Sequence, residues 1–291
     1  MTTQTEVAPL RRVIVKHPRE AFVSDLTVAR AWRDFGFEGR PDLRTAIDEY
    51  DAFLEILEGF GTEVHRLPRD DQVGLDSLYP RDAAISTDAG LVLCNMGKAL
   101  RRQEPRALER FAAELGLPVR GAITGRGLLE GGDVVWLDER TLAVGRSYRS
   151  NEEGIRQLHD ILGEAIELAV VPLPHYRGPG DVFHLMSILS PIDRKLALVY
   201  SPLLPIPFRE WLLARGIRLV ETPEPEFRSL GCNVLTLAPG LCVALEGNPL
   251  TRARLEAAGA QVITFRGSEI CARGNGGPTC LTRPLERGPQ G

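Results

Sequence analysis

Short apolar runs and amphipathic segments follow one another along this chain in a recurring order. A strand-like run is followed by a turn containing Asp, Pro or Gly, a second strand-like run, a helix of about ten to fifteen residues and a third strand. Four copies are complete, with first strand, second strand, helix and third strand at Ala83–Ser86, Leu91–Cys94, Glu104–Leu115 and Leu117–Val119; Asp133–Leu137, Thr141–Val144, Glu152–Leu162 and Ile166–Val171; Leu185–Leu189, Leu196–Tyr200, Pro207–Ala214 and Ile217–Val220; and Asn233–Leu237, Leu241–Leu245, Pro249–Ala258 and Val262–Phe265. The pattern predicts ββαβ units in an α/β fold.

The N-terminal part of the chain carries a partial copy of the same unit. It consists of a predicted strand at Arg12–Lys16, a helix at Asp42–Glu58 and a strand at Glu63–Leu67. Units that recur about every 45–55 residues are typical of a radial or stacked repeat. Five such units fill residues 1–291 as a single domain without linkers. Ordinary α/β alternation without symmetry is the alternative interpretation.

Polar residues gather where units enter their first strands. In a radial arrangement these entries would converge on one face of the molecule. The entry segments are Tyr79–Asp82, Leu129–Asp133, Pro179–His184 and Gly274–Cys280. They carry acids, one histidine and one thiol, so we expect these side chains to meet at the centre.

Cys280 follows a glycine-rich bend that begins at Arg273. Glycines can adopt positive φ and let the backbone approach a ligand, and successive N–H groups can form a positive nest that favours a thiolate. The alternative is a glycine turn with a buried, inert cysteine. Cys271, just before the bend, is the rival thiol. The remaining cysteines lie in or beside apolar strand runs and are interpreted as packing residues: Cys94, Cys232 and Cys242.

Two acids, the histidine and the thiol form a combination suited to a planar cation. Asp82 and Glu130 can accept guanidinium N–H donors in bidentate pairs, which leaves the central carbon exposed to Cys280. His184 can protonate the leaving nitrogen and later deprotonate the incoming nucleophile. This chemistry requires no metal and no organic cofactor.

Each of these residues also has a purely structural interpretation. Asp82 can cap a strand end or form a surface ion pair, and Glu130 can belong to a tight Gly-Gly turn. His184 can be a core imidazole with one hydrogen bond. These alternatives lose ground because all of these residues lie at entries of the predicted units.

Composition narrows the classes of partner. The net charge is −4, with 35 basic and 39 acidic residues, and the absence of a basic stripe with interleaved aromatics argues against nucleic acid. The N-terminus lacks the apolar core of a signal peptide, and no run of about 18 apolar residues predicts a membrane span. The five cysteines lack Cys-x-x-Cys spacing and the five histidines lack His-Glu-x-x-His spacing. We therefore expect a cytoplasmic protein without disulfides or a metal site.

Four motifs occur in a fixed order along the chain: Tyr-Pro-Arg-Asp (79–82), Leu-Glu-Gly-Gly-Asp-Val (129–134), His-Leu (184–185) and Gly-Asn-Gly-Gly-Pro-Thr-Cys-Leu-Thr (274–282). With them the chain resembles the guanidino-group-modifying enzyme superfamily, from Val13 to Thr282. This superfamily contains arginine deiminases, dimethylarginine dimethylaminohydrolases and amidinotransferases. The resemblance implies the pentein fold, a five-bladed pseudo-symmetric α/β propeller.

The resemblance also implies a role for each central residue. Cys280 resembles the nucleophile that forms a covalent thiouronium intermediate, and His184 resembles the general acid and base. Glu130 resembles the carboxylate beside the guanidinium and the histidine, and Asp82 resembles the guanidinium-binding acid. The implied partner is a small guanidino compound.

Further residues match positions that contact the rest of the substrate. Arg101 or Arg102 lies where these enzymes often place an arginine for the substrate carboxylate, and Arg149 matches a second such arginine. A solvated surface position is the alternative for each arginine. Asp181 can supply a second acid to the guanidinium.

The subfamilies differ two residues after the histidine. Arginine deiminases and amidinotransferases usually carry an aspartate there, whereas this chain has Met186. Dimethylarginine dimethylaminohydrolases also lack that acid, and an apolar corner at Met186 would suit N-methyl groups. Arg81-Asp82 and the Gly-Gly-Pro-Thr-Cys ending are more similar to deiminases. We expect a hydrolase that converts methylated arginine to citrulline and methylamine.

Two other functions stay open. An amidinotransferase or arginine deiminase of the same fold would use the same residues, and a propeller of the same shape can be a binding module without chemistry. The segment Ser24–Gly39, which carries Trp32, Phe35 and Phe37, is either a lid over the site or a packed N-terminal helix and loop. The sequence makes no prediction about oligomeric state.

Overall fold

The computed structural model describes residues 2–178 and 183–288. The strands are β1 (Leu10–Val15), β2 (Glu63–Arg66), β3 (Ala84–Thr87), β4 (Gly90–Leu93), β5 (Val119–Ala122), β6 (Val134–Asp138), β7 (Thr141–Arg146), β8 (Glu167–Pro172), β9 (Leu189–Asp193), β10 (Leu196–Val199), β11 (Arg218–Glu221), β12 (Leu235–Ala238), β13 (Leu241–Leu245), β14 (Gln261–Phe265) and β15 (Thr282–Arg287). The helices are α1 (Pro18–Ala21), α2 (Asp25–Ala31), α3 (Leu43–Gly59), α4 (Glu104–Glu114), α5 (Glu152–Leu162), α6 (Ile206–Ala214), α7 (Glu224–Phe227) and α8 (Pro249–Ala257).

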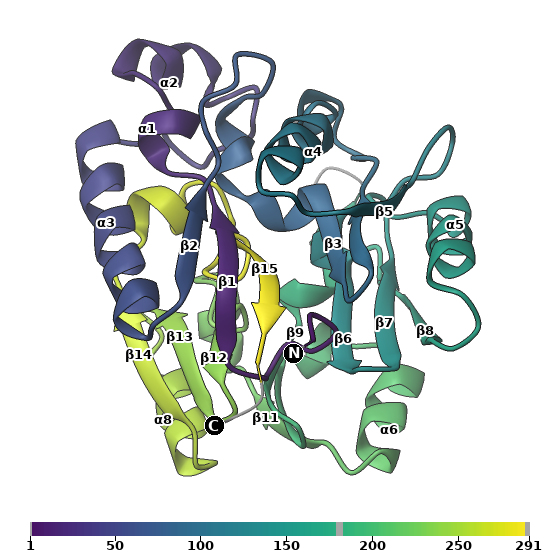
Figure 1. Cartoon of the computed structure of the whole chain (residues 1–291). Coiled ribbons are helices and arrows are strands. Elements are labelled where there is room, and N and C mark those ends of the chain that lie inside the picture. The colour runs from purple at the N-terminus through teal and green to yellow at the C-terminus, as the bar shows by residue number, and fades with distance from the viewer. Residues whose placement is uncertain (1, 179–182, 289–291) are drawn as a thin grey trace.

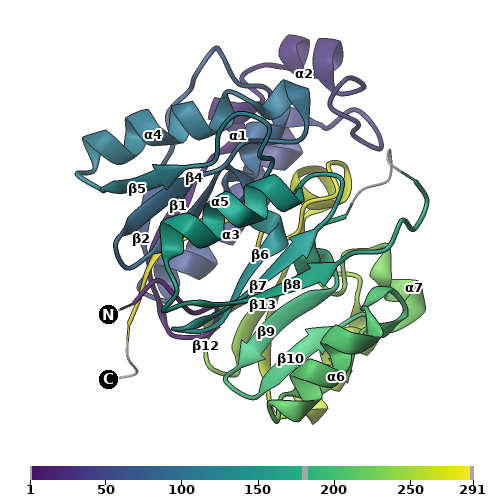
Figure 2. The same ribbon diagram turned by 90° about the vertical axis from the view of Figure 1, so that its right-hand side faces the viewer.

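The described strands form five three-stranded sheets arranged radially (Figure 1). The sheets are β15-β1-β2, β3-β4-β5, β6-β7-β8, β9-β10-β11 and β12-β13-β14. In each sheet the middle strand is antiparallel to the strand at one side and parallel to the strand at the other. Each parallel pair is joined by a helix on the outside of the ring, as Figure 2 shows for α5 and α6. The fold is the predicted five-bladed propeller of ββαβ units.

The partial N-terminal copy is completed from the other end of the chain. Strand β15 pairs antiparallel with β1, with Ile14 opposite Arg283, and so supplies the strand that the first unit lacks (Figure 1). The sequence pattern did not predict β15, because its residues belong to a unit that begins about 270 residues earlier. The first and last strands therefore close the ring.

Local signals in the sequence explain why some boundaries were predicted well. Helix α5 has its predicted bounds because the Asn151 side chain accepts a hydrogen bond from the Gly154 backbone, and Gly163 ends the helix at φ 80°. Its buried face consists of Ile155, Leu158 and Leu162, at helical spacing. Capping chemistry and apolar periodicity agree at this helix.

Two predicted strands are placed wrongly. The predicted strand Leu185–Leu189 is a 3-10 turn over Leu185–Ser187, and β9 begins only at Leu189. The apolar run misled the prediction because a buried turn and a buried strand have the same composition. The predicted strand Leu117–Val119 lies two residues early, since β5 begins at Val119.

Buried charges connect the blades next to the axis of the ring. Arg81 Nη2 donates to Glu6 Oε2 at 2.8 Å, and both side chains are almost fully buried. Arg283 Nη1 donates to the Ala84 carbonyl at 2.7 Å, and Arg287 Nη1 donates to the Thr236 carbonyl at 2.9 Å. Burial would raise the pKa of Glu6, but the neighbouring Arg81 guanidinium outweighs it and the pKa is lowered. The N-terminal segment thus links blades far apart in sequence.

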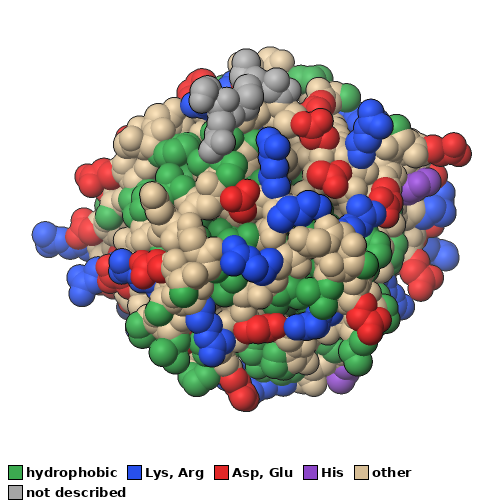
Figure 3. All heavy atoms as spheres, turned by 90° about the horizontal axis from the view of Figure 1, so that it is seen from below, with side chains coloured by type: hydrophobic (Ala, Val, Ile, Leu, Met, Phe, Trp, Pro, Cys, Tyr) green, Lys and Arg blue, Asp and Glu red, His purple; other side chains and the backbone are tan. Residues whose placement is uncertain are grey.

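The face seen from below in Figure 1 carries the chain ends. Lys or Arg and Asp or Glu side chains are intermixed on this face (Figure 3). Among the described residues, no helix combines the length and the apolar character that crossing a bilayer requires.

Ring closure by β1 predicts a large effect of truncating a buried residue on that strand. Ile14 is fully buried and packs among residues of the next blade. Ile14→Ala should lower the free energy of unfolding by about 2–5 kcal/mol, because it removes buried apolar surface and leaves a cavity. The exposed Leu250→Ala should change it by less than about 0.5 kcal/mol. Equilibrium urea unfolding measures both, and equal effects would contradict the packing described here.

Candidate active site

A cavity of about 430 Å³ lies at the end of the propeller that carries α2, opposite the chain termini (Figures 1 and 2). Five of the residues predicted for the site line it: Asp82, Arg101, Arg149, His184 and Cys280. Glu130 is fully buried and contacts His184. Arg102 is exposed and is not among the lining residues, and Asp181 lies outside the described residues. The predicted convergence of the entry segments is therefore observed for Asp82, Glu130, His184 and Cys280.

The five blades each place one polar side chain shortly before their first strand. These are Cys280 before β15, Asp82 before β3, Glu130 before β6, His184 before β9 and Asn233 before β12. The site is thus built from one repeated position of the fold.

Asn233 is the site residue that the sequence reasoning missed. Its Nδ2 donates to Cys280 Sγ at 3.4 Å, and its Oδ1 accepts from the Thr279 backbone at 3.1 Å. The signal was present, because Asn233 opens the last predicted unit at the position where the other units carry their site residues. Asn233 orients the sulfur.

Close contacts at the entry of β6 explain its Gly-Gly pair. A Cβ on Gly132 would lie 2.5 Å from His184 Nδ1 and 2.6 Å from Asp82 Oδ1, and one on Gly131 would lie 2.2 Å from the Arg81 carbonyl. The Gly132 backbone also donates to Asp82 Oδ1 at 2.9 Å. Only glycine lets the three blades approach this closely.

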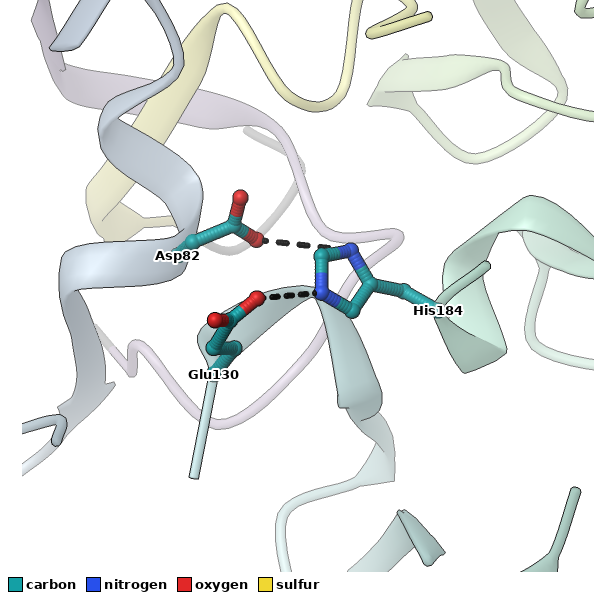
Figure 4. A group of neighbouring side chains, drawn as sticks. All are labelled: Asp82, Glu130 and His184. Carbon is teal, nitrogen blue, oxygen red and sulfur yellow. Dashed lines mark hydrogen bonds and ion pairs between the residues drawn. The ribbon is translucent and has the colours of Figure 1, made fainter. Parts of the chain in front are cut away.

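The His184 imidazole lies between two carboxylates (Figure 4). Its Nε2 is 2.7 Å from Glu130 Oε2, and its Nδ1 is 3.7 Å from Asp82 Oδ1. Ligand atoms of the three side chains lie within 4.8 Å of one another, so the group can hold a cation. A guanidinium is the cation for which two adjacent carboxylates are best suited.

The two acids keep His184 charged at neutral pH. Burial would lower the pKa of His184, but the Asp82 charge and the Glu130 hydrogen bond outweigh it and raise the pKa to about 9. Burial would raise the pKa of Glu130, but its contacts with His184 and Arg149 hold that pKa well below its ordinary value. At pH 7 the group is an imidazolium flanked by carboxylates.

Asp133 fixes the turn that presents His184. Its Oδ1 accepts from the Leu185 backbone at 2.9 Å, and its Oδ2 accepts from the hydroxyls of Ser147 and Ser150 at 2.7 Å each. Leu185 and Asp133 are fully buried. The histidine therefore stands on a turn anchored to the neighbouring blade.

Cys280 is partly exposed, whereas the other four cysteines are buried. Burial and the Asp82 charge raise the pKa of Cys280 to about 11, although the Asn233 hydrogen bond opposes them. The expectation of a thiolate favoured by a positive nest is therefore wrong for the unliganded protein. An acid lies nearer to the sulfur's field than any compensating cation does. Cys271, the rival thiol, is fully buried.

The glycines before Cys280 serve close packing instead of unusual φ angles. In this bend the residue with positive φ is Asn275, at 57°. A Cβ on Gly274 would lie 2.0 Å from Tyr79 Oη, and one on Gly277 would lie 2.5 Å from the Asn233 side chain. The bend is therefore pressed against the residues that line the cavity.

Arg101 has a different environment from the one expected for a substrate-carboxylate ligand. Its Nη1 donates to Asp82 Oδ2 at 2.6 Å, and its Nη2 donates to Glu104 Oε2 at 2.7 Å. Nη2 also donates to the Tyr79 carbonyl at 3.0 Å, and the side chain is buried. Arg101 thus orients Asp82. Exposed Arg102 does not reach the cavity lining.

Arg149 is better placed to contact a ligand. Its Nη1 donates to Glu130 Oε2 at 3.0 Å, and its side chain is partly exposed in the cavity. The hydrogen bonds of its guanidinium to described residues all use Nη1. Its remaining donors face the space that a substrate would fill.

The wall of the cavity differs from the expected apolar corner. Met186 is buried in the core and is not a lining residue, whereas the adjacent Ser187 is. The side chain points inward because Leu185–Ser187 is a turn and not a strand. Apolar lining is supplied instead by Tyr176, Phe183, Phe227 and Leu230.

The segment Ser24–Gly39 is both a packed helix and a wall of the site. Phe37 is buried in the core, whereas Phe35 lines the cavity. The Glu38 backbone donates to the Arg273 carbonyl at 2.7 Å, so the segment is tied to the Gly-rich bend.

Comparison with known proteins agrees with this site. The family model described as N,N dimethylarginine dimethylhydrolase, eukaryotic, matches residues 33–287. The chain belongs to this family. It is therefore a member of the pentein superfamily of guanidino-group-modifying enzymes, as the motifs predicted.

Relatives of this dimethylarginine dimethylhydrolase family member match it over nearly its whole length. The uncharacterized protein YkgA of Bacillus subtilis is 28% identical over 98% of this chain and 95% of its own. The N(G),N(G)-dimethylarginine dimethylaminohydrolase of Pseudomonas aeruginosa is 24% identical over 94% of this chain and 98% of its own.

Solved structures show the same fold. A mutant dimethylarginine dimethylaminohydrolase from Pseudomonas aeruginosa, complexed with citrulline, matches with a TM-score of 0.76 and 23% identity over 94% of this chain and 98% of that one. SxtG, an amidinotransferase from Microseira wollei, matches with a TM-score of 0.74 and 18% identity over 97% and 96% of the two chains. Both hydrolase and transferase chemistry therefore occur on this fold.

The contact between His184 and Glu130 predicts a change in the titration of the histidine. Glu130→Gln removes the charged hydrogen-bond acceptor, so the pKa of His184 should fall from about 9 towards its ordinary value. NMR of histidine-labelled protein as a function of pH measures this shift. The signals of the other four histidines should titrate identically in both proteins. An unchanged His184 curve would show that the contact does not set its charge.

Proposed function

We propose that this protein hydrolyses the guanidinium of an arginine-like compound through a covalent Cys280 intermediate. The proposed reaction converts N-methylated arginine to citrulline and methylamine. The observation that carries the proposal is that all five blades place a polar side chain around one cavity, which brings a partly exposed thiol to two acids and a histidine. The family match supports the same chemistry.

In the first step a guanidinium replaces part of the charge that His184 now supplies between Asp82 and Glu130. Cys280 Sγ forms a bond to the guanidinium carbon, and the C–N bond to the methylated nitrogen breaks. The leaving nitrogen keeps the bonding electrons and takes a proton from the His184 imidazolium. The products of this step are methylamine and a thiouronium on Cys280.

In the second step water attacks the thiouronium carbon. Neutral His184 accepts a proton from the water, the C–S bond breaks, and Cys280 leaves with the electron pair. A carbonyl forms where the sulfur was attached, which gives the ureido group of citrulline. A pKa of about 9 lets His184 donate its proton in the first step and recover it in the second.

The high pKa of the free thiol is compatible with this role. A bound guanidinium brings a positive charge beside Cys280 and Asp82, and an adjacent cation favours the thiolate. The substrate therefore promotes formation of its own nucleophile, while an empty site keeps the sulfur protonated and unreactive.

The choice of an N-methylated substrate has support from the cavity wall and the family. Tyr176, Phe183, Phe227 and Leu230 give the lining an apolar part that can accommodate N-alkyl groups. Release of ammonia from arginine would identify a deiminase instead, and formation of a new guanidino compound from an added amine would identify an amidinotransferase.

Replacing the proposed nucleophile separates chemistry from binding. Cys280→Ser should lower turnover by three or more orders of magnitude, about the loss seen when a nucleophile is removed, while substrate affinity persists. Assays for citrulline, methylamine and ammonia measure turnover, and calorimetry measures affinity. Cys271→Ala is the matched control and should stay active, because Cys271 is buried away from the cavity lining. A near wild-type rate for Cys280→Ser would overturn the assignment.

The raised thiol pKa predicts how labelling depends on pH. A neutral reagent such as iodoacetamide should modify Cys280 about tenfold faster for each pH unit between 7 and 10, because the thiol titrates only near 11. A cationic haloamidine should react readily at pH 7, because its charge favours the thiolate. Mass spectrometry follows both reactions, with Cys280→Ser as the control. A plateau for iodoacetamide below pH 8 would show a preformed thiolate.

A further inference from the structure

A lysine of the protein itself occupies a cation site in the wall of the cavity. The Lys98 ammonium donates to Asp76 Oδ2 at 2.6 Å and to the carbonyl of Phe35. It also lies 5.5 Å from the centre of the Phe35 ring, within cation–π distance. Lys98, Asp76 and Phe35 all line the cavity. The structure thus contains a complete ammonium site with its own occupant.

Lys98 is fixed relative to the reacting centre. The backbone amides of Gly97 and Lys98 donate to Glu130 Oε1 at 2.9 and 3.3 Å, and Arg149 donates to the same carboxylate. A Cβ on Gly97 would lie 2.9 Å from Arg149 Cα, so the two segments are in direct contact. Lys98 and Arg149 therefore enter the cavity from positions that Glu130 anchors.

The acids of the lining offer few places for a second cation. Four carboxylates line the cavity: Asp34, Glu38, Asp76 and Asp82. Asp82 belongs to the guanidinium end, and Asp34 and Glu38 are exposed. Asp76 is the remaining buried carboxylate, and Lys98 already neutralises it. An incoming ammonium would have to displace Lys98 or bind beside a like charge.

The free donors of the same region suit an anion instead. Arg149 uses only Nη1 in its hydrogen bonds to described residues, and an ammonium has three donors, of which Lys98 spends two on Asp76 and Phe35. A carboxylate accepts from such groups without displacing either of them. The far end of the cavity is therefore electrostatically asymmetric, favouring a carboxylate over an ammonium.

We propose that Lys98 is a specificity-determining residue that selects N-substituted guanidino carboxylic acids without an α-ammonium over their α-amino acid counterparts. This inference rests on the proposed function and narrows its substrate class. Methylated arginine is accepted, but its ammonium competes with Lys98.

The test compares two substrates that differ only in the ammonium. Nω-methylarginine and the 5-(N′-methylguanidino)pentanoate of equal chain length are assayed for kcat/KM with the wild-type protein. The wild type should prefer the pentanoate by about tenfold or more, the effect of one like charge placed nearby. Lys98→Met should improve the amino acid and weaken the pentanoate, so that the ratio falls at least tenfold. Lys98→Arg should retain the preference.

Controls distinguish the local charge from folding and from failure of the chemistry. Lys195→Met removes an exposed lysine from another blade and should leave the ratio unchanged. Lys98→Met/Asp76→Asn avoids an unpaired buried acid and should lack the wild-type preference even if the single variant is unstable. Calorimetry of both compounds with Cys280→Ser measures the same preference without turnover, so a failed hydrolase assay does not decide it. A wild type that favours the amino acid, or a ratio unaffected by either Lys98 variant, overturns the proposal.

Discussion

The interaction on which the site depends is the pairing of buried charges at the meeting point of three blades. The His184 imidazolium lies between Asp82 and Glu130, and arginines approach both acids from behind. A buried carboxylate without a partner is strongly destabilising. The acids can therefore stay ionised and ready for a guanidinium because the protein surrounds them with cations. The same arrangement explains the close Gly-Gly turn, since only a bare backbone brings these groups into range.

The pentein ring turns a structural repeat into a catalytic constellation. An entry turn that recurs in every blade delivers a side chain to the axis, and the side chain differs from blade to blade. A thiol, an amide, an imidazole and two carboxylates thus meet without any blade departing from the common architecture. Closing the ring with β15 is essential to this arrangement, because that strand directly follows Cys280. Stability of the first blade and placement of the nucleophile are consequently one problem.

Much of this could be predicted from the sequence because the signals were local or repeated. The turn chemistry predicted the ββαβ units, and the entry segments predicted the meeting of Asp82, Glu130, His184 and Cys280. What failed required knowledge of packing. The apolar character of Leu185 did not reveal that Asp133 holds its backbone in a turn, and this error also placed Met186 wrongly. Charges near Cys280 likewise depend on three-dimensional proximity, so a glycine-rich sequence could not predict the direction of its pKa.

The arginines show the same limit from the other side. Arg101, Arg102 and Arg149 are equivalent as letters, yet one is buried against Asp82, one is exposed, and one reaches the cavity. Their difference follows from the position of Glu130, which holds the Gly97–Lys98 segment and Arg149 together. Recognition of the far end of a substrate is thereby coupled to the acid that serves the guanidinium. A change at Glu130 would disturb both ends of the cavity, so its kinetic effect reports on the coupled network and not on a single hydrogen bond.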